Sequence, residues 1–303
     1  MRPRDLDRAS AIDKALTEYS IDSRNLPGIS RPEERHALVE QIIESLRRVE
    51  FARRLGESDI SPRRGDPADA MFDPLRAAIL RMRQGETDEA YWLVYLFIYF
   101  GRHPVGGWSY VRRIYGALGA RPWWTWAEVA VNPAQFCEWM LDHQADIRDG
   151  ARSGFGNHRK YESLRKVGDG VESYVRWVAP PRAHDELFAA ARERHNGDPR
   201  AAFGYLYKSL LRVDRFGRVA TFDYLCMVGK LGFSQIEPDT PHLGGATGPL
   251  RGARLLVGAD MSPSQLDQIL LDLGAKLGVG MQVIEDSLCN WQKSPNRFRP
   301  FRG

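Results

Sequence analysis

Three carboxylates stand where their side chains could do chemistry, one in the middle of the chain and two near its end. Asp223 follows a turn that contains Gly217 and precedes the apolar run Tyr224–Val228. Glu285 and Asp286 lie in a segment, MQVIEDSLCNWQK, whose apolar residues recur at helical spacing. A carboxylate beside a sugar can stabilise positive charge on the ring and can orient or deprotonate water. We expect Asp223 to be catalytic, then Asp286, then Glu285; the structural alternative is an acid that stabilises a helix start.

Two predicted helix starts carry the wrong charge for an isolated helix. Arg159 and Lys160 lie in the predicted first turn of NHRKYESL, and Arg251 and Arg254 lie in the first turns of GPLRGARLL. Cations at a helix N-terminus oppose its dipole, unless an anion binds there to the free backbone N–H groups. We expect DNA phosphate to be this anion. The alternative is that these side chains pair with acids such as Glu162.

Further basic residues are candidates for contact with DNA. The chain ends in KSPNRFRPFRG, where Lys293 and Arg297 are interleaved with phenylalanines, a pattern that can follow a nucleic-acid backbone. A disordered tail is the alternative. Arg218 follows the turn at Gly217, and Lys208 lies off the apolar face of its predicted helix. Lys208 is expected to contact phosphate, with a Schiff-base nucleophile as the second interpretation.

The elements that position these residues are predicted to be helices, because apolar residues recur at helical spacing almost throughout. No alternating strand pattern stands out, so the predicted fold class is all-α. A loop rich in Pro, Gly and Asp at 56–74 predicts an N-terminal helical segment at 1–65 and a main helical domain at 66–303. Helices are expected at 33–54, 90–100, 133–142, 183–195, 199–213, 221–231, 263–277 and 281–292.

Composition limits the class of protein. The chain has 303 residues, 43% hydrophobic and 27% charged, and a net charge of +4, which suits a nucleic-acid partner. Cys137, Cys226 and Cys289 are far apart and form no CxxC pair, so we expect no metal site, no cofactor and a reduced, cytoplasmic protein. The start lacks the apolar core of a signal peptide. The longest apolar run, Ala90–Phe100, is too short to span a bilayer.

Five motifs, taken in order, resemble the alpha-glutamyl/putrescinyl thymine pyrophosphorylase family, in its third clade. They are GFGNHRKYESL, SYVRWV, FGRVATFDYL, GATGPLRGARLL and EDSLCNWQKSP, and the similarity covers Ala90 to the end of the chain. The resemblance implies a helix–hairpin–helix, DNA-glycosylase-like fold, with two helical lobes and a basic cleft between them. The resemblance also extends to phage-defence glycosylases that excise glucosylated hydroxymethylcytosine.

The resemblance implies chemistry on a modified base in double-stranded phage DNA, with no membrane and no protein partner. We expect a DNA glycosylase that flips a bulky base into a pocket and leaves an abasic site. Asn157, His158 and Tyr161 are candidates to line this pocket. His103, Trp108 and the cluster WWTW at 123–126 could also contribute, although packing is the alternative for them. The alternatives are an enzyme that displaces pyrophosphate from an activated hydroxymethyl pyrimidine, and a non-catalytic module that binds modified DNA.

Overall fold

The structure, a computed structural model, describes residues 2–148, 154–156 and 159–300, and every regular element in these ranges is a helix. The single β-type pairing there is an isolated bridge between His103 and Gly107, where the chain turns back on itself. The prediction of an all-α protein is therefore confirmed.

The chain forms two compact units. The terminal unit contains the residues up to Arg53 and those from Glu237 onward, and the central unit contains Arg54–Ile236. The division falls within α2 (Pro32–Glu57). The predicted boundary at residue 65, the helix–hairpin–helix motif and the basic cleft stay predictions.

The terminal unit has its own apolar core, built from leucine-rich helices. A methyl group on Gly252 of α13 (Gly248–Val257) would lie 2.4 Å from the carbonyl oxygen of Leu288 in α15 (Met281–Trp291). The close approach of these two helices therefore requires glycine there. Trp291 is fully buried, and its indole N–H donates to the carbonyl oxygens of Glu34 and Pro295. Besides the first part of α2, the helices of this unit are α1 (Leu6–Asp22), α13 (Gly248–Val257), α14 (Pro263–Leu277) and α15 (Met281–Trp291).

The start of α14 is capped by side chains. Ser262 Oγ accepts a hydrogen bond from the backbone N–H of Gln265 at 3.3 Å, and Gln265 Oε1 accepts one from the backbone N–H of Ser262 at 2.9 Å. This reciprocal capping satisfies two N–H groups that the helix leaves free, with Pro263 at the first helical position.

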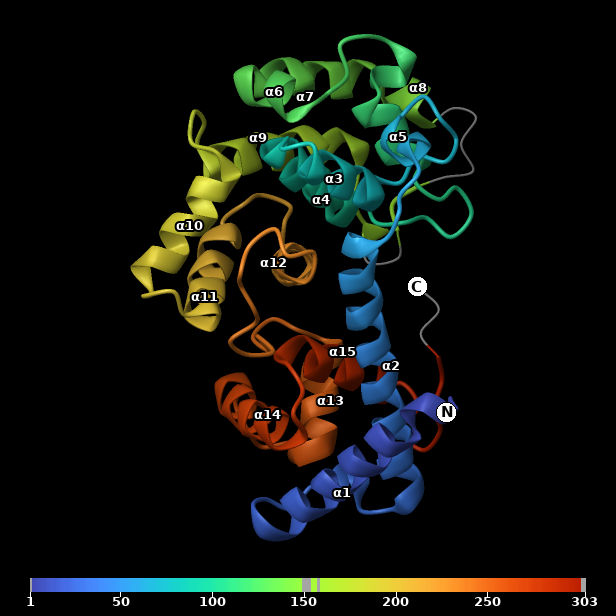
Figure 1. Cartoon of the computed structure of the whole chain (residues 1–303), viewed down its shortest axis with the longest axis vertical. Helices are drawn as coiled ribbons and strands as arrows, with labels where there is room; N and C mark the ends of the chain where they lie inside the picture. Colours follow the sequence, from blue (N-terminus) through green and yellow to red (C-terminus); the bar gives the residue numbers. More distant parts are fainter. Residues whose placement is uncertain (1, 149–153, 157–158, 301–303) are drawn as a thin grey trace. The chain divides into compact units, whose positions relative to one another are not determined.

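The central unit is built around α4 (Thr87–Phe100), which is apolar on all sides and buried, as the sequence predicts. Figure 1 shows α3 running beside it, and the two helices pack together. The helices of this unit are α3 (Pro74–Arg83), α4, α5 (Ser109–Tyr115), α6 (Trp126–Val131), α7 (Pro133–Asp142), α8 (Gln144–Arg148), α9 (Val167–Val178), α10 (His184–Arg194), α11 (Pro199–Leu210) and α12 (Arg218–Lys230).

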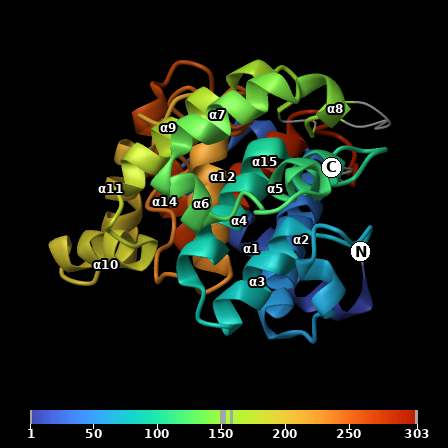
Figure 2. The ribbon, with the colours of Figure 1, turned by 90° about the horizontal axis from the view of Figure 1, so that it is seen from above.

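Helices α7 and α9 lie side by side in both Figure 1 and Figure 2. A methyl group on Gly168 of α9 would be 2.8 Å from the Sγ atom of Cys137 in α7, so the contact depends on a glycine. Burial is the main cause that raises the pKa of Cys137 to about 11. All three cysteines are free thiols.

Several predicted helix bounds shift by a few residues. α12 begins at Arg218 rather than at 221, because Gly217 is its N-cap, and α11 ends at Leu210 rather than at 213. Among the described residues, no helix combines the length and apolar character that crossing a membrane requires.

Candidate functional site

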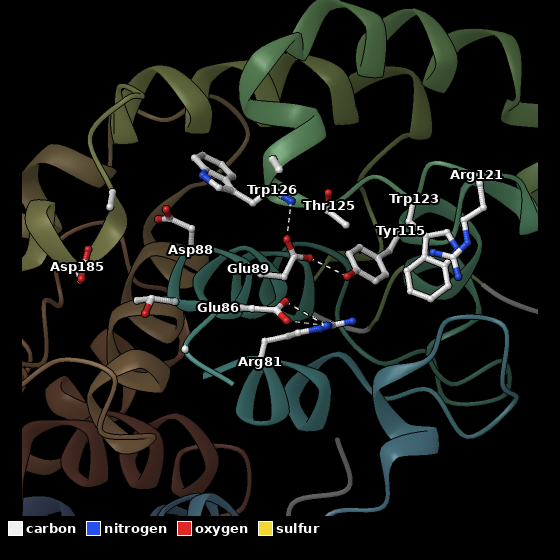
Figure 3. Close-up of a pocket in the computed structure, with 14 residues that line it drawn as sticks. Arg81, Glu86, Asp88, Glu89, Tyr115, Arg121, Trp123, Thr125, Trp126 and Asp185 are labelled. Carbon is white, nitrogen blue, oxygen red and sulfur yellow. Dashed lines mark hydrogen bonds and ion pairs between the residues drawn. The ribbon is translucent and has the colours of Figure 1, made fainter. Parts of the chain in front are cut away.

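A pocket of about 620 Å³ lies within the central unit, where the first residues of α4, α6 and α10 come together (Figure 3). This volume is in the range of small-molecule sites. The lining combines aromatic rings with side chains of both charges. The residues are Arg81, Gly85, Glu86, Thr87, Asp88, Glu89, Tyr115, Arg121, Trp123, Thr125, Trp126, Ala127, Ala183 and Asp185.

The sequence around α4 places two adjacent acids at this pocket. The chain leaves α3 through Gly85, whose φ of 80° suits glycine, and α4 then begins at Thr87. Asp88 and Glu89 occupy the first turn, where the helix dipole favours negative charge. The apolar residues that follow anchor the helix in the core, so the backbone that carries the two carboxylates is held in place.

Glu89 is buried, with 9% of its surface exposed, and both of its carboxyl oxygens are engaged. The Tyr115 hydroxyl donates to Oε1 at 2.7 Å, and the backbone N–H of Trp126 donates to Oε2 at 2.7 Å. Burial raises the pKa of Glu89, although both hydrogen bonds act in the opposite direction. Glu89 thereby joins α4 to α5 and to the start of α6.

Asp88 differs from its neighbour, because its side chain is 35% exposed. Its Oδ1 atom accepts two hydrogen bonds from His184, one from the backbone N–H at 2.7 Å and one from the ring Nδ1 at 2.6 Å. Burial acts to raise the pKa of Asp88, but the hydrogen bonds from His184 outweigh it and lower the pKa. Asp88 is therefore ionised at neutral pH.

His184 is fully buried and continues this network into the core. Its Nε2 atom lies 2.9 Å from the Tyr174 hydroxyl, which lies 2.8 Å from the Tyr224 hydroxyl. Burial is the largest influence on the ring and lowers the pKa of His184, while the bond to Asp88 acts to raise it. A neutral ring with its proton on Nδ1 satisfies all these contacts, since Nε2 then accepts from Tyr174.

Aromatic rings and arginines form the other side of the pocket. The guanidinium of Arg121 lies 3.6 Å from the ring centroid of Trp123, a cation–π contact, and Arg81 forms an ion pair with Glu86 at 3.1 Å. Figure 3 shows Asp88 near Trp126, with Trp123 and Arg121 on the opposite side. The site can stack a planar ring and supply both a hydrogen-bond acceptor and a buried carboxyl group.

The aromatic residues that the sequence suggested for the pocket fall into two groups. Trp123 and Trp126 line the pocket. Trp108 packs against Phe97, with ring centroids 4.9 Å apart. His103 shapes a turn, where its Nδ1 atom accepts a hydrogen bond from the backbone N–H of Gly106 at 3.0 Å.

Asp223 is half-buried in α12 and is not among the residues that line the pocket. The prediction that it lies near a helix N-terminus is wrong, because α12 begins at Arg218 and Asp223 is its sixth residue. The influence of the helix dipole fades beyond the first turn. Its catalytic role stays a prediction.

Asp286 and Glu285 lie in α15 of the terminal unit, and both are half-buried. Ser45 donates to the Asp286 carboxylate at 2.7 Å, and Arg48 forms an ion pair with it. Asn290 donates to its other oxygen at 3.1 Å. These bonds connect α2 to α15, which is what a structural acid does; catalysis by Asp286 or Glu285 stays a prediction.

The predicted helix start at Arg159 and Lys160 is wrong. Lys160 lies in a turn, and regular α-helix begins only at Val167. The described backbone of this segment forms turns, in which the N–H of Arg159 donates to the carbonyl of Gly156 at 2.8 Å and the N–H of Glu162 donates to that of Arg159 at 2.9 Å. Asn157 and His158 lie outside the described residues.

The side chains in this segment differ in exposure. Arg159 Nε donates to the carbonyl of Tyr99 and its Nη2 to that of Arg215, both at 2.8 Å. Lys160 is exposed, and its Nζ lies 5.0 Å from the ring centroid of Tyr161, which is 87% exposed. Tyr161 is not among the residues that line the pocket.

The remaining basic candidates are distributed over both units. Arg251 and Arg254 are exposed on α13, and Lys208 is exposed on α11. Arg218 is half-buried, with its guanidinium 4.9 Å from the ring centroid of Phe222. In the tail, Lys293 donates to Asn290 Oδ1 at 3.0 Å and Arg297 is exposed. Their role in DNA binding stays a prediction.

Asp88, Glu89 and His184 were not predicted from the sequence. One signal could have found the acids, since they directly precede the longest apolar run of the chain. Their partners could not be read from local sequence, because Glu89 bonds to residues 26 and 37 positions away and Asp88 to one 96 positions away.

Comparison with models of protein families shows which family the chain resembles. The family model described as alpha-glutamyl/putrescinyl thymine pyrophosphorylase clade 3 matches residues 33–303. The comparison with curated proteins and that with solved structures found no match. Within the described residues, no group of three or more His, Cys, Asp or Glu side chains is placed to hold a metal ion.

Proposed function

The chain belongs to the alpha-glutamyl/putrescinyl thymine pyrophosphorylase family, clade 3, and from this premise we propose that it is a DNA glycosylase for bulky modified bases. In this proposal the enzyme flips a hypermodified base, such as glucosylated hydroxymethylcytosine, out of phage DNA and leaves an abasic site. Its biological role would be defence against phages.

The observation that carries this proposal is the pocket in the central unit. A base that leaves the stack needs an aromatic face in place of its neighbours, and the half-buried Trp123 is the candidate for this contact, with the buried rings of Tyr115 and Trp126 in the pocket wall. A bulky substituent needs room and polar partners, and the pocket offers about 620 Å³ with two arginines and four acids.

Cleavage of an N-glycosidic bond also needs a carboxylate, because positive charge builds on the sugar as the bond breaks. Asp223 is the candidate from sequence, with Asp286 and Glu285 behind it. The pocket adds Asp88, which is ionised, and Glu89, whose pKa burial raises. Two carboxyl groups whose environments move their pKa values apart are typical of acid–base sites.

The family description favours a second candidate function, the displacement of pyrophosphate from an activated hydroxymethyl pyrimidine. The glycosidic bond would then stay intact. Arg159, Lys160, Arg251 and Arg254 are the pyrophosphate ligands that the sequence suggests. Arg159 binds two backbone carbonyls, so Arg81 and Arg121 of the pocket are the better-placed cations.

One experiment separates these functions. The protein is incubated with phage DNA that contains glucosylated hydroxymethylcytosine, with unmodified DNA as the control, and the products are analysed by mass spectrometry and by gel after mild alkali. A released base with alkali-labile strands is the expected result. A changed base mass in intact strands would establish pyrophosphate displacement instead. A band shift with unchanged DNA would reduce the protein to a binding module.

A further inference from the structure

The pocket contains four acids, and three of them do not combine a free carboxylate oxygen with a fixed orientation. Glu89 has both oxygens engaged in the core, and Glu86 is paired with Arg81. Asp185 is exposed, and its hydrogen bond, at 2.9 Å, comes from the adjacent backbone N–H of Glu186, so among the described residues no other side chain holds its carboxylate in place. A reacting carboxylate needs one free oxygen and an orientation that neighbouring groups hold in place, and none of these three side chains has both.

Asp88 combines them. Both hydrogen bonds from His184 end on Oδ1, and within the described part of the chain no donor bonds to Oδ2. The side chain is partly exposed and lines the pocket beside Trp126 (Figure 3). One oxygen is therefore held in place, while the other is not engaged by the described part of the chain.

The groups behind Asp88 fix its orientation. The His184 ring stacks on Tyr91 at 5.2 Å between centroids and meets Trp126 edge-on at 4.5 Å. Its Nε2 atom is occupied by Tyr174, which Tyr224 in turn contacts. With these two ring contacts and one nitrogen engaged, the ring directs the remaining N–H at Asp88 Oδ1.

We propose that Asp88 is the catalytic carboxylate of this pocket and that His184 is its positioning residue. This inference rests on the function proposed above. As the C1′–N bond of the flipped nucleotide breaks, its electron pair leaves on the base nitrogen and a water oxygen bonds to C1′. Asp88 Oδ2 accepts one proton of that water and later passes it to the base, so water adds across the bond and no oxidant or metal is consumed.

The test is single-turnover base release from modified DNA, measured beside a DNA-binding titration. Asp88→Asn keeps an oxygen that can accept from His184 but removes the charge, so release should fall by about 10²–10³-fold while binding persists. Asp142→Asn is the matched control, because it makes the same change at an exposed residue of the same unit outside the pocket; its release should stay near the wild-type rate. Asp223→Asn is measured beside it, to test the carboxylate that the sequence suggests.

His184→Phe keeps the ring but removes the N–H that stabilises the Asp88 carboxylate. The acid limb of its pH–rate profile should therefore move to higher pH, which a decrease in the amount of folded protein alone would not cause. His184→Asn retains a donor and should restore the wild-type limb.

The outcomes separate the two proposals. If the wild-type protein releases base and Asp88→Asn does so at a similar rate, the assignment of Asp88 is overturned while the glycosylase function stands. Loss of release in Asp223→Asn alone would return catalysis to Asp223. If the wild-type protein releases no base from any modified DNA, both proposals fail.

Discussion

At the scale of single residues, Asp88 and Glu89 are adjacent in sequence, but their environments shift their pKa values in opposite directions. Asp88 keeps its charge because His184 donates two hydrogen bonds to it, whereas burial makes charge costly for Glu89. The neutral state of His184 follows from the same geometry, since the ring is buried and its two nitrogens have fixed partners.

The state of His184 predicts a loss of stability in acid. Burial lowers the pKa of His184 below its ordinary value of 6.5, so below that pH the unfolded chain binds a proton that the folded chain does not. The free energy of unfolding should fall with pH from there, by at most about 1.4 kcal/mol per pH unit from this group, until the pH reaches the lowered pKa. Asp88 loses its contribution only at lower pH, below its ordinary value of 3.8.

Urea denaturation of wild-type protein and His184→Asn, from about pH 8 to about pH 5, measures this effect. The variant should be less stable at the upper pH but should lose less stability on acidification. Equal losses in both proteins would show that His184 is not the titrating group.

The sequence could suggest residue types but not these states. The prediction for Asp223 depended on a helix start three residues too late, and Arg159 was expected in the first turn of an α-helix that begins only at Val167. The roles of Asp88, Glu89 and His184 depend on burial and on partners distant in the chain, which local sequence does not reveal.

At the scale of elements, the two acids of α4 connect three helices. Asp88 accepts from the first residue of α10, and Glu89 accepts from the first residue of α6. Such carboxylates satisfy N–H groups that a helix start leaves free. Helix periodicity predicted most of these elements; the connections between them were not predictable, because they join segments far apart in sequence.

Glu89 tests this connecting role. Glu89→Ala leaves the Tyr115 hydroxyl and the Trp126 N–H buried without an acceptor, at a cost of about 1–3 kcal/mol for each group. Glu89→Gln keeps an acceptor and removes the buried charge, so its stability should stay close to that of the wild type. Chemical denaturation of both variants provides the measurement, and similar large losses in both would contradict it.

At the scale of the whole molecule, the first and last segments of the chain form one unit and the middle forms the other. Local sequence does not reveal this arrangement, because it requires contacts between residues more than two hundred positions apart, such as Lys276 with Glu18. Exposed basic side chains occur on both units, on α13 and in the turn at Lys160. We propose that both units contact DNA.

Salt dependence tests that proposal. Replacing Lys160, Arg251 and Arg254 together by alanine should weaken binding to all sequences and reduce the slope of log K against log salt by about 1 for each phosphate that is no longer bound. Arg159→Ala should mainly lower stability, because its guanidinium binds backbone carbonyls. An unchanged slope in the triple variant would exclude these residues from the DNA-binding surface.

Filling the pocket of the central unit tests most directly whether this pocket receives the modified base. Ala127 lines it and is exposed, so Ala127→Trp should occupy the cavity, while Ala190→Trp on the exposed surface of α10 adds the same bulk elsewhere. Base release from modified DNA is measured for both folded variants beside their DNA affinity. We predict that Ala127→Trp abolishes release but still binds DNA and that Ala190→Trp behaves as the wild type. Undiminished release by Ala127→Trp would contradict the account.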